Sequence, residues 1–212
     1  MSRYVSRFTL TERLIHWVHA SAFFVLLGSG LVLYLPSLAI AVGRRPVVKD
    51  VHVYTAIAWA IAIVAIAALG NRRALLRTVR EIDLFDREDR RFLAGRLRSP
   101  QGRLNAGQKV NAILTAAFAV LFAVSGALLW YGERNTSVRL PGTVFLHDAL
   151  TYLSIILVVG HLYLAVIYPK TRHALRGMTL GTVSEDWARV HHAKWVDELA
   201  QERAVDEQAP VR

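Results

Sequence analysis

The sequence contains no cysteine, and this absence removes several kinds of site from consideration. Without thiolates the chain cannot form disulfides, hold an iron–sulfur cluster, build a thiolate zinc site or attach a c-type haem covalently. The absence says nothing about the redox compartment. Any metal-containing cofactor must be held by other side chains, of which histidine is the commonest metal ligand.

Acidic residues are also scarce. The chain has 16 Asp and Glu against 26 Lys and Arg, while 54% of its 212 residues are hydrophobic. A basic chain this apolar fits a membrane protein with basic loops better than a nucleic-acid-binding protein. No long linker rich in Pro, Gly or Ser divides the sequence, so we predict a single membrane domain, 1–212.

Four apolar runs are long enough to cross a membrane, for which about 20 residues are needed. They cover residues 14–35, 52–69, 110–131 and 144–168. A cleaved signal peptide is the alternative for the first run, but the apolar region of such peptides is normally about 7–15 residues long. The pattern therefore predicts an all-α fold, an antiparallel four-helix bundle integral to the membrane.

Basic residues are distributed unevenly between the polar segments. The N-terminus, the loop 71–109 and the tail 170–212 hold 21 of the 26 Lys and Arg, which predicts that both termini and this loop are cytoplasmic. Within the loop, apolar residues at positions 75, 76, 79 and 82 predict an amphipathic helix on the membrane surface, although a solvated helix fits equally. The tail is predicted to be polar and partly helical.

Five histidines lie within or at the ends of the apolar runs, and four of them can be paired: His16, His52, His147 and His161, with His19 as the fifth. An ionisable side chain in a spanning helix is rare and usually functional. The predicted orientation places His16 and His161 at the cytoplasmic level, and His52 and His147 at the outer level. Two cross-helix pairs of imidazoles are the arrangement that two six-coordinate haems require, and such haems transfer electrons because no axial position stays open.

Other interpretations of the histidines remain open. His19 follows His16 by one turn and could replace it as a ligand, whereas histidines near span ends often bind water or lipid headgroups instead. A zinc site would need three or four ligands that converge at one point, and the sequence offers two per level. His173, His191 and His192 lie in polar sequence and are predicted to be solvated.

Small residues recur in the spans. Ser29-Gly30-Leu31 in the first run is echoed by Ser125-Gly126-Ala127 in the third, an echo too weak to define an internal repeat. Small residues in spanning helices most often serve packing, but they also let a flat ligand approach closely. The glycines to which this applies are Gly28, Gly30, Gly126 and Gly160.

Several stretches carry a family resemblance: 8–13, 15–17, 104–109, the histidines of the fourth run, and 187–195. Through them the chain resembles the integral cytochrome b, or gamma, subunit of respiratory formate dehydrogenase. The Asn-Ala-Gly-Gln-Lys string, 105–109, and the paired histidines are the most specific parts. The resemblance implies that His52 and His147 hold an outer haem b, and that His16 and His161 hold an inner one.

The resemblance also implies a menaquinone or ubiquinone site beside the inner haem, formed by Asn105, Gly107, Gln108 and His161. Carboxamides donate hydrogen bonds to quinone carbonyls, and a glycine lets backbone N–H groups approach. From the residues alone, 105–108 is equally well explained as a capped turn at the start of the third span.

By this resemblance the chain is the membrane-anchoring electron-transfer subunit of a formate dehydrogenase in the bacterial inner membrane. The implied partners are an iron–sulfur subunit and a molybdenum- or tungsten-containing catalytic subunit, together with quinone and membrane lipids, but no nucleic acid. The alternatives are a cytochrome b of a hydrogenase or thiosulfate-reductase-type complex and, from a different class, a small proton-coupled membrane transporter.

Overall fold

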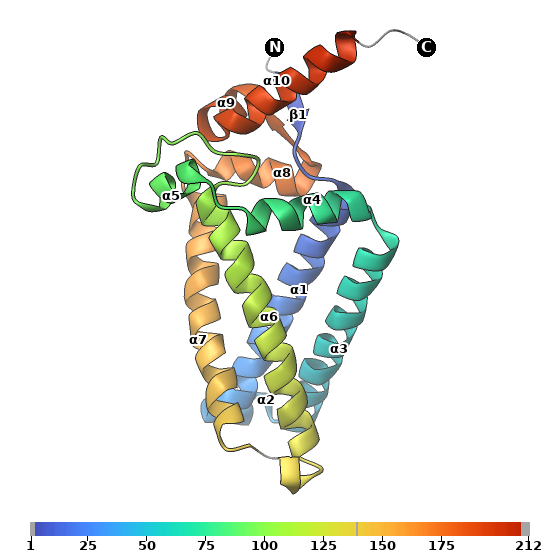
Figure 1. Cartoon of the computed structure of the whole chain (residues 1–212). Helices are drawn as coiled ribbons and strands as arrows, with labels where there is room; N and C mark the ends of the chain where they lie inside the picture. Colours follow the sequence, from blue (N-terminus) through green and yellow to red (C-terminus); the bar gives the residue numbers. More distant parts are fainter. Residues whose placement is uncertain (1–2, 139, 209–212) are drawn as a thin grey trace. The chain divides into compact units, whose positions relative to one another are not determined.

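The computed structural model describes residues 3–138 and 140–208 and is mostly helical (Figure 1). The described chain divides into two compact units, which are treated separately below. The apolar unit consists of residues 10–75 and 115–160, and the polar unit of residues 3–9, 76–114 and 161–208. The predicted all-α class is confirmed, apart from one two-stranded sheet in the polar unit.

Among the residues that the structure describes, four helices are long and apolar enough to cross a membrane. They are α1 (Leu10–Tyr34), α3 (Arg45–Leu69), α6 (Ala106–Gly132) and α7 (Gly142–Leu162), the last continued as a span to Ile167. Each of these helices begins before the apolar run from which it was predicted, because its first turn contains polar residues. In α3 this turn contains Pro46, which needs no intrahelical hydrogen-bond partner at that position.

Two regions next to the spans have features that the apolar runs did not predict, and each contains a proline. The fourth span closes in a π-helical turn, Tyr163–Ile167, and Tyr168 is extended because Pro169 disfavours a helical residue before it. After α1 the chain forms a short helix, α2 (Pro36–Val42), with Pro36 in its first turn. Gly43, with a φ of +63°, ends it in the left-handed region that glycine adopts without strain.

The long helices expose large apolar side chains along their length. Ile61 and Val64 of α3 are 65% and 67% exposed, and Phe145 and Ile156 of α7 are 76% and 71% exposed. Exposed apolar surface on this scale marks contact with another apolar phase, and helices with internally satisfied backbones are suited to lipid. The described surface is therefore that of a membrane protein.

Within the apolar unit, α1 packs along α3. The Tyr152 hydroxyl of α7 donates a hydrogen bond of 3.0 Å to the Tyr34 hydroxyl of α1. Lys49 of α3 pairs with Glu133, the residue after α6, at 2.8 Å. These contacts connect α1 with α7 and α3 with the end of α6.

The polar unit has its own small core. Strand β1 (Tyr4–Ser6) pairs antiparallel with β2 (Thr182–Ser184), with Val5 opposite Val183. Around this sheet lie α8 (Leu175–Leu180), α9 (Glu185–His191) and α10 (Ala193–Gln208), so the tail is helical in part. The buried cluster consists of Val5, Val183, Ala188, Trp195 and Val196.

The loop 71–109 contains α4 (Arg72–Asp83) and α5 (Arg87–Leu93). In the polar unit, Lys109 of α6 donates to Asp89 of α5 at 2.6 Å and to the Leu84 carbonyl at 2.9 Å. Both charged side chains are nearly inaccessible to solvent, so neither charge has water as an alternative partner. This buried ion pair fixes the loop to the first turn of the third span.

Candidate functional site

The structure brings His52 and His147 together in the apolar unit. His52 lies on α3 and His147 on α7, with ring centroids 6.4 Å apart and ring planes at 62°. Phe122 of α6 stands edge-on to His147 at 5.1 Å between centroids. Two imidazoles from different spans are thus held side by side among apolar side chains.

Each of these imidazoles contacts a serine hydroxyl at its Nδ1 atom. Ser29 Oγ of α1 lies 2.9 Å from His52 Nδ1, and Ser125 Oγ of α6 lies 2.9 Å from His147 Nδ1. The two serines come from the two spans that do not carry these histidines. All four spans therefore contribute to this part of the structure, one side chain each.

A glycine follows each serine and lies against the same ring. A Cβ atom added to Gly30 would lie 3.4 Å from His52 Cε1, and one added to Gly126 would lie 3.7 Å from His147 Cε1. The ring edges therefore occupy the space beside these glycines. The serines were missed in the interpretation of the sequence, and the weak Ser-Gly echo was the signal that could have revealed them.

The other two predicted ligands lie in different units. His16 of α1 belongs to the apolar unit and stands edge-on to Trp17 at 5.0 Å, whereas His161 of α7 belongs to the polar unit. His19 also faces an aromatic ring, with its centroid 5.7 Å from that of Trp59 in α3. The pairing of His16 with His161, and the alternative ligand His19, stay predictions.

The Asn-Ala-Gly-Gln motif forms a reciprocal cap at the start of α6. The Asn105 N–H donates to Gln108 Oε1 at 3.0 Å, and the Gln108 N–H donates to Asn105 Oδ1 at 2.9 Å. Gly107, between them, is exposed. The cap uses the carboxamide oxygens only, so the side-chain N–H groups, two per carboxamide, remain as hydrogen-bond donors for a ligand.

Arg7 connects this motif to the tail within the polar unit. Its Nη2 donates to Gln108 Oε1 at 3.1 Å and to His192 Nε2 at 3.0 Å. The prediction that His192 is solvated is wrong: this ring is 1% exposed, and its Nδ1–H donates to the Gly102 carbonyl at 2.7 Å. Arg7 holds His192 in the interior, because a guanidinium can only donate and so needs the unprotonated Nε2.

Burial sets the charge states of this contact. Burial first, and the nearby Arg103 second, lower the pKa of Arg7 to about 9, which leaves the guanidinium charged at neutral pH. Burial and the Arg7 charge hold the pKa of His192 well below its usual value. His192 is therefore neutral, as the contact with Arg7 requires.

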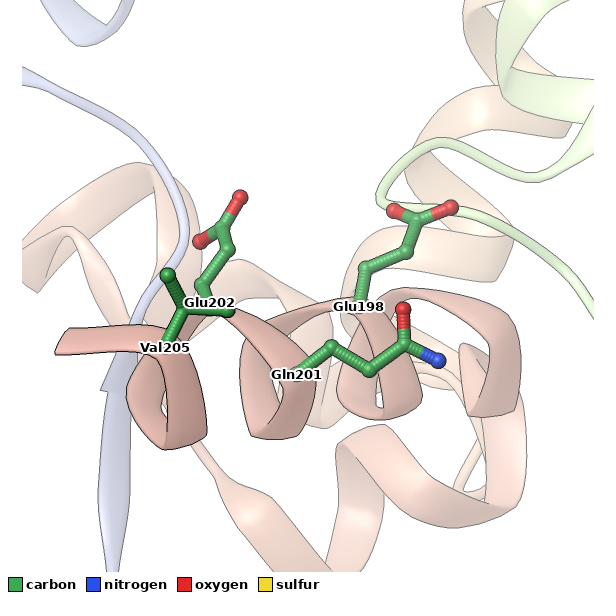
Figure 2. A pocket seen from close by; sticks show the side chains of 4 residues that line it. All are labelled: Glu198, Gln201, Glu202 and Val205. Carbon is green, nitrogen blue, oxygen red and sulfur yellow. The ribbon is translucent and has the colours of Figure 1, made fainter. Parts of the chain in front are cut away.

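An open depression lies along α10 in the polar unit (Figure 2). It is lined by Glu198, Gln201, Glu202 and Val205. Burial is the main cause that raises the pKa of Glu198. The lining includes none of the predicted site residues.

Comparison with known proteins identifies the family. Residues 7–181 match the family described as prokaryotic cytochrome b561, which covers most of the chain. The chain belongs to this family.

Similar proteins have the names that the resemblance predicted. This cytochrome is 26% identical to the formate dehydrogenase cytochrome b556(fdo) subunit of Escherichia coli K12 over 92% of the chain and 93% of that protein. It is 23% identical to the nitrate-inducible formate dehydrogenase cytochrome b556(Fdn) subunit of the same strain, over 97% and 96%. It is 22% identical to the formate dehydrogenase cytochrome b556 subunit of Haemophilus influenzae, over 92% and 83%. The predicted resemblance is confirmed.

Membership of a b-type cytochrome family implies haem b as the cofactor, and the apolar unit fits it. A metal bound between two imidazoles lies about 2 Å from each nitrogen, which separates the ring centroids by roughly 6 Å. The 6.4 Å between His52 and His147 matches this requirement. Because serines contact both Nδ1 atoms, Nε2 is the ring atom that would be available to a metal.

Proposed function

We propose that this cytochrome is the membrane-anchoring electron-transfer subunit of a quinone-dependent formate dehydrogenase. The observation that carries the proposal is the imidazole pair His52–His147, in a chain similar to formate dehydrogenase subunits over nearly its whole length. Ligation by two histidines leaves no axial site open, which favours electron transfer over oxygen chemistry. An iron–sulfur subunit is the proposed donor, and a molybdenum- or tungsten-containing subunit the site of formate oxidation.

In this proposal the whole chain, 1–212, forms a single domain that holds two b haems. His52 and His147 bind the outer iron, and His16 and His161 bind the inner one. Bound haem supplies one-electron oxidation and reduction. The four imidazoles would hold the irons, and the apolar helices around them would limit the access of water to the haems.

The proposed quinone site uses Asn105, Gly107 and Gln108. In the structure the carboxamide oxygens cap α6, so the quinone carbonyls would accept from the side-chain N–H groups. Exposed Gly107 lets the ring approach the backbone of the first turn. Quinone reduction also takes up two protons, and in the predicted orientation this end of α6 takes them from the cytoplasm.

Formate should reduce the haems of the purified complex without added mediators, and a quinone analogue should reoxidise them. The reason is that the proposed circuit connects formate oxidation to quinone through this chain alone. Anaerobic visible spectra of the α band measure both steps. Hydrogen replaces formate in a parallel cuvette, and haem reduction by hydrogen but not by formate would assign the chain to a hydrogenase instead.

Both termini should lie in the cytoplasm, because 21 of the 26 Lys and Arg lie in the N-terminus, the loop 71–109 and the tail. We expect alkaline phosphatase fused after residue 212 to be inactive and a fluorescent protein there to be bright. The matched control is a phosphatase inserted after Arg134, between the third and fourth spans, which should be active. The reverse pattern at both positions would invert the proposed orientation.

A further inference from the structure

Ser29 and Ser125, the two serines beside the imidazole pair, use their hydroxyl protons in hydrogen bonds within their own helices. The Ser29 hydroxyl lies 2.7 Å from the Val25 carbonyl, one turn earlier in α1. The Ser125 hydroxyl lies 2.7 Å from the Leu121 carbonyl, one turn earlier in α6. A hydroxyl has a single proton, and a backbone carbonyl can only accept. Each serine proton is therefore directed to its own helix.

The contacts with the rings then have a fixed direction. At 2.9 Å from Nδ1, each serine oxygen acts as the acceptor and the imidazole as the donor. His52 and His147 are accordingly protonated at Nδ1, which leaves the Nε2 lone pair free. The same arrangement occurs twice, on two pairs of helices.

We propose that Ser29 and Ser125 are positioning residues for the outer haem. They fix the Nδ1–H tautomer and the orientation of both axial imidazoles, and they increase the electron donation of these rings to iron. A hydrogen-bond acceptor on the distal nitrogen makes an imidazole a stronger ligand. The inference rests on the proposed ligation of the outer haem by His52 and His147.

The two serines should influence the oxidised and reduced haem unequally. A more basic imidazole stabilises ferric iron, which carries the extra positive charge, more than ferrous iron. Removal of a serine hydroxyl should therefore weaken haem binding by about 10–100-fold, as is typical for residues that hold metal ligands. It should also raise the midpoint potential of the outer haem, and a tenfold loss confined to the ferric state corresponds to a rise of about 59 mV.

The test compares Ser29→Ala and Ser125→Ala with wild type in the purified complex. Haem content after dilution into detergent measures affinity, and spectroelectrochemical titration of the α band measures both midpoint potentials. We expect the outer potential to rise and outer haem occupancy to fall in each variant. The inner haem, whose potential should stay unchanged, reports in the same sample that the protein is folded.

Two further variants separate positioning from packing. Ser154→Ala removes a buried hydroxyl of α7 that is likewise bonded to its own helix, at 2.8 Å from the Thr151 carbonyl, and should leave both potentials unchanged. Ser29→Thr keeps the hydroxyl and should restore the wild-type potential. Equal potentials in Ser29→Ala, Ser125→Ala and Ser154→Ala would overturn the inference. So would a Thr variant that behaves like Ala.

The ligation proposal fails separately from this inference. If His52→Ala and His147→Ala both retain two haems, the proposed ligands are wrong and the serine proposal falls with them. If those variants lose the outer haem while the serine variants match wild type in potential and occupancy, the ligands stand and only the serine proposal is rejected.

Discussion

His52→Ala and His147→Ala should each yield a complex with one b haem instead of two. The two rings lie 6.4 Å apart, and loss of either nitrogen leaves the outer iron with a single axial ligand from the protein. The remaining imidazole would keep its serine contact at Nδ1, but its Nε2 would lose the iron as partner within a span. Pyridine haemochrome analysis measures the haem content, and the reduced α band shows which haem remains.

His173→Ala serves as the matched control, because this imidazole accepts a hydrogen bond from the Ser184 backbone in the polar unit and lies on no predicted span. It should retain both haems. Two intact haems in both His52→Ala and His147→Ala would contradict the proposed pair. His16→Ala and His19→Ala extend the series, since only the variant that removes the inner ligand should lose the inner haem.

The second large effect is expected on quinone reduction, through the side-chain N–H donors of the Asn-Ala-Gly-Gln motif. Gln108→Glu retains the oxygen that accepts from Asn105 and Arg7, but it lacks the carboxamide N–H groups. Loss of one hydrogen bond in a buried site costs about 1–3 kcal/mol, or roughly five- to more than a hundredfold in affinity. We expect formate to reduce the haems normally in this variant, while reoxidation by quinone slows to that extent.

Gln101→Ala is the control for this variant. The Gln101 Oε1 accepts from the Ala106 N–H and so also caps α6, while its Nε2 donates to backbone carbonyls. Its loss disturbs the helix start without removing a donor available to quinone, and reoxidation should stay fast if the complex assembles. Quinone kinetics unchanged in Gln108→Glu combined with Asn105→Asp would place the site elsewhere.

The spans were predictable because lipid-facing helices require long apolar runs whatever their neighbours are. The polar first turns were not, since residues such as Arg45 and Gln108 carry no hydrophobic signal. The strands β1 and β2 could not be predicted either, because three residues are too few to show an alternation of apolar and polar side chains. Their pairing depends on residues that are far apart in the chain.

At the candidate site, the sequence could indicate which side chains are unusual but not every contact they make. His52 and His147 stood out because imidazoles are rare in spans, and the structure places them side by side. His192 was interpreted as solvated because its neighbours are polar, whereas its burial depends on Arg7, which is distant in sequence. For residues 105–108 the structure has the capped turn that was one of the two interpretations, and the quinone role stays a proposal.

The sheet in the polar unit pairs a strand near the N-terminus with a strand that follows the last span. The order of synthesis therefore determines when this unit can form. Strand β1 precedes every span, and its partner β2 follows the last one. The Arg7–His192 contact likewise bridges 185 positions. At a synthesis rate of about 5–20 residues per second, β1 leaves the ribosome on the order of ten seconds or more before its partner exists.

Closure of this sheet therefore comes late, after all four apolar helices have been synthesised. A nascent chain that ends between residues 168 and 181 contains every span and every proposed haem ligand, yet Val5 has no strand to pair with. Pairing of the N-terminal strand thus requires synthesis past all four apolar helices. Incomplete chains leave β1 without a partner, and an unpaired strand is open to pairing with other chains.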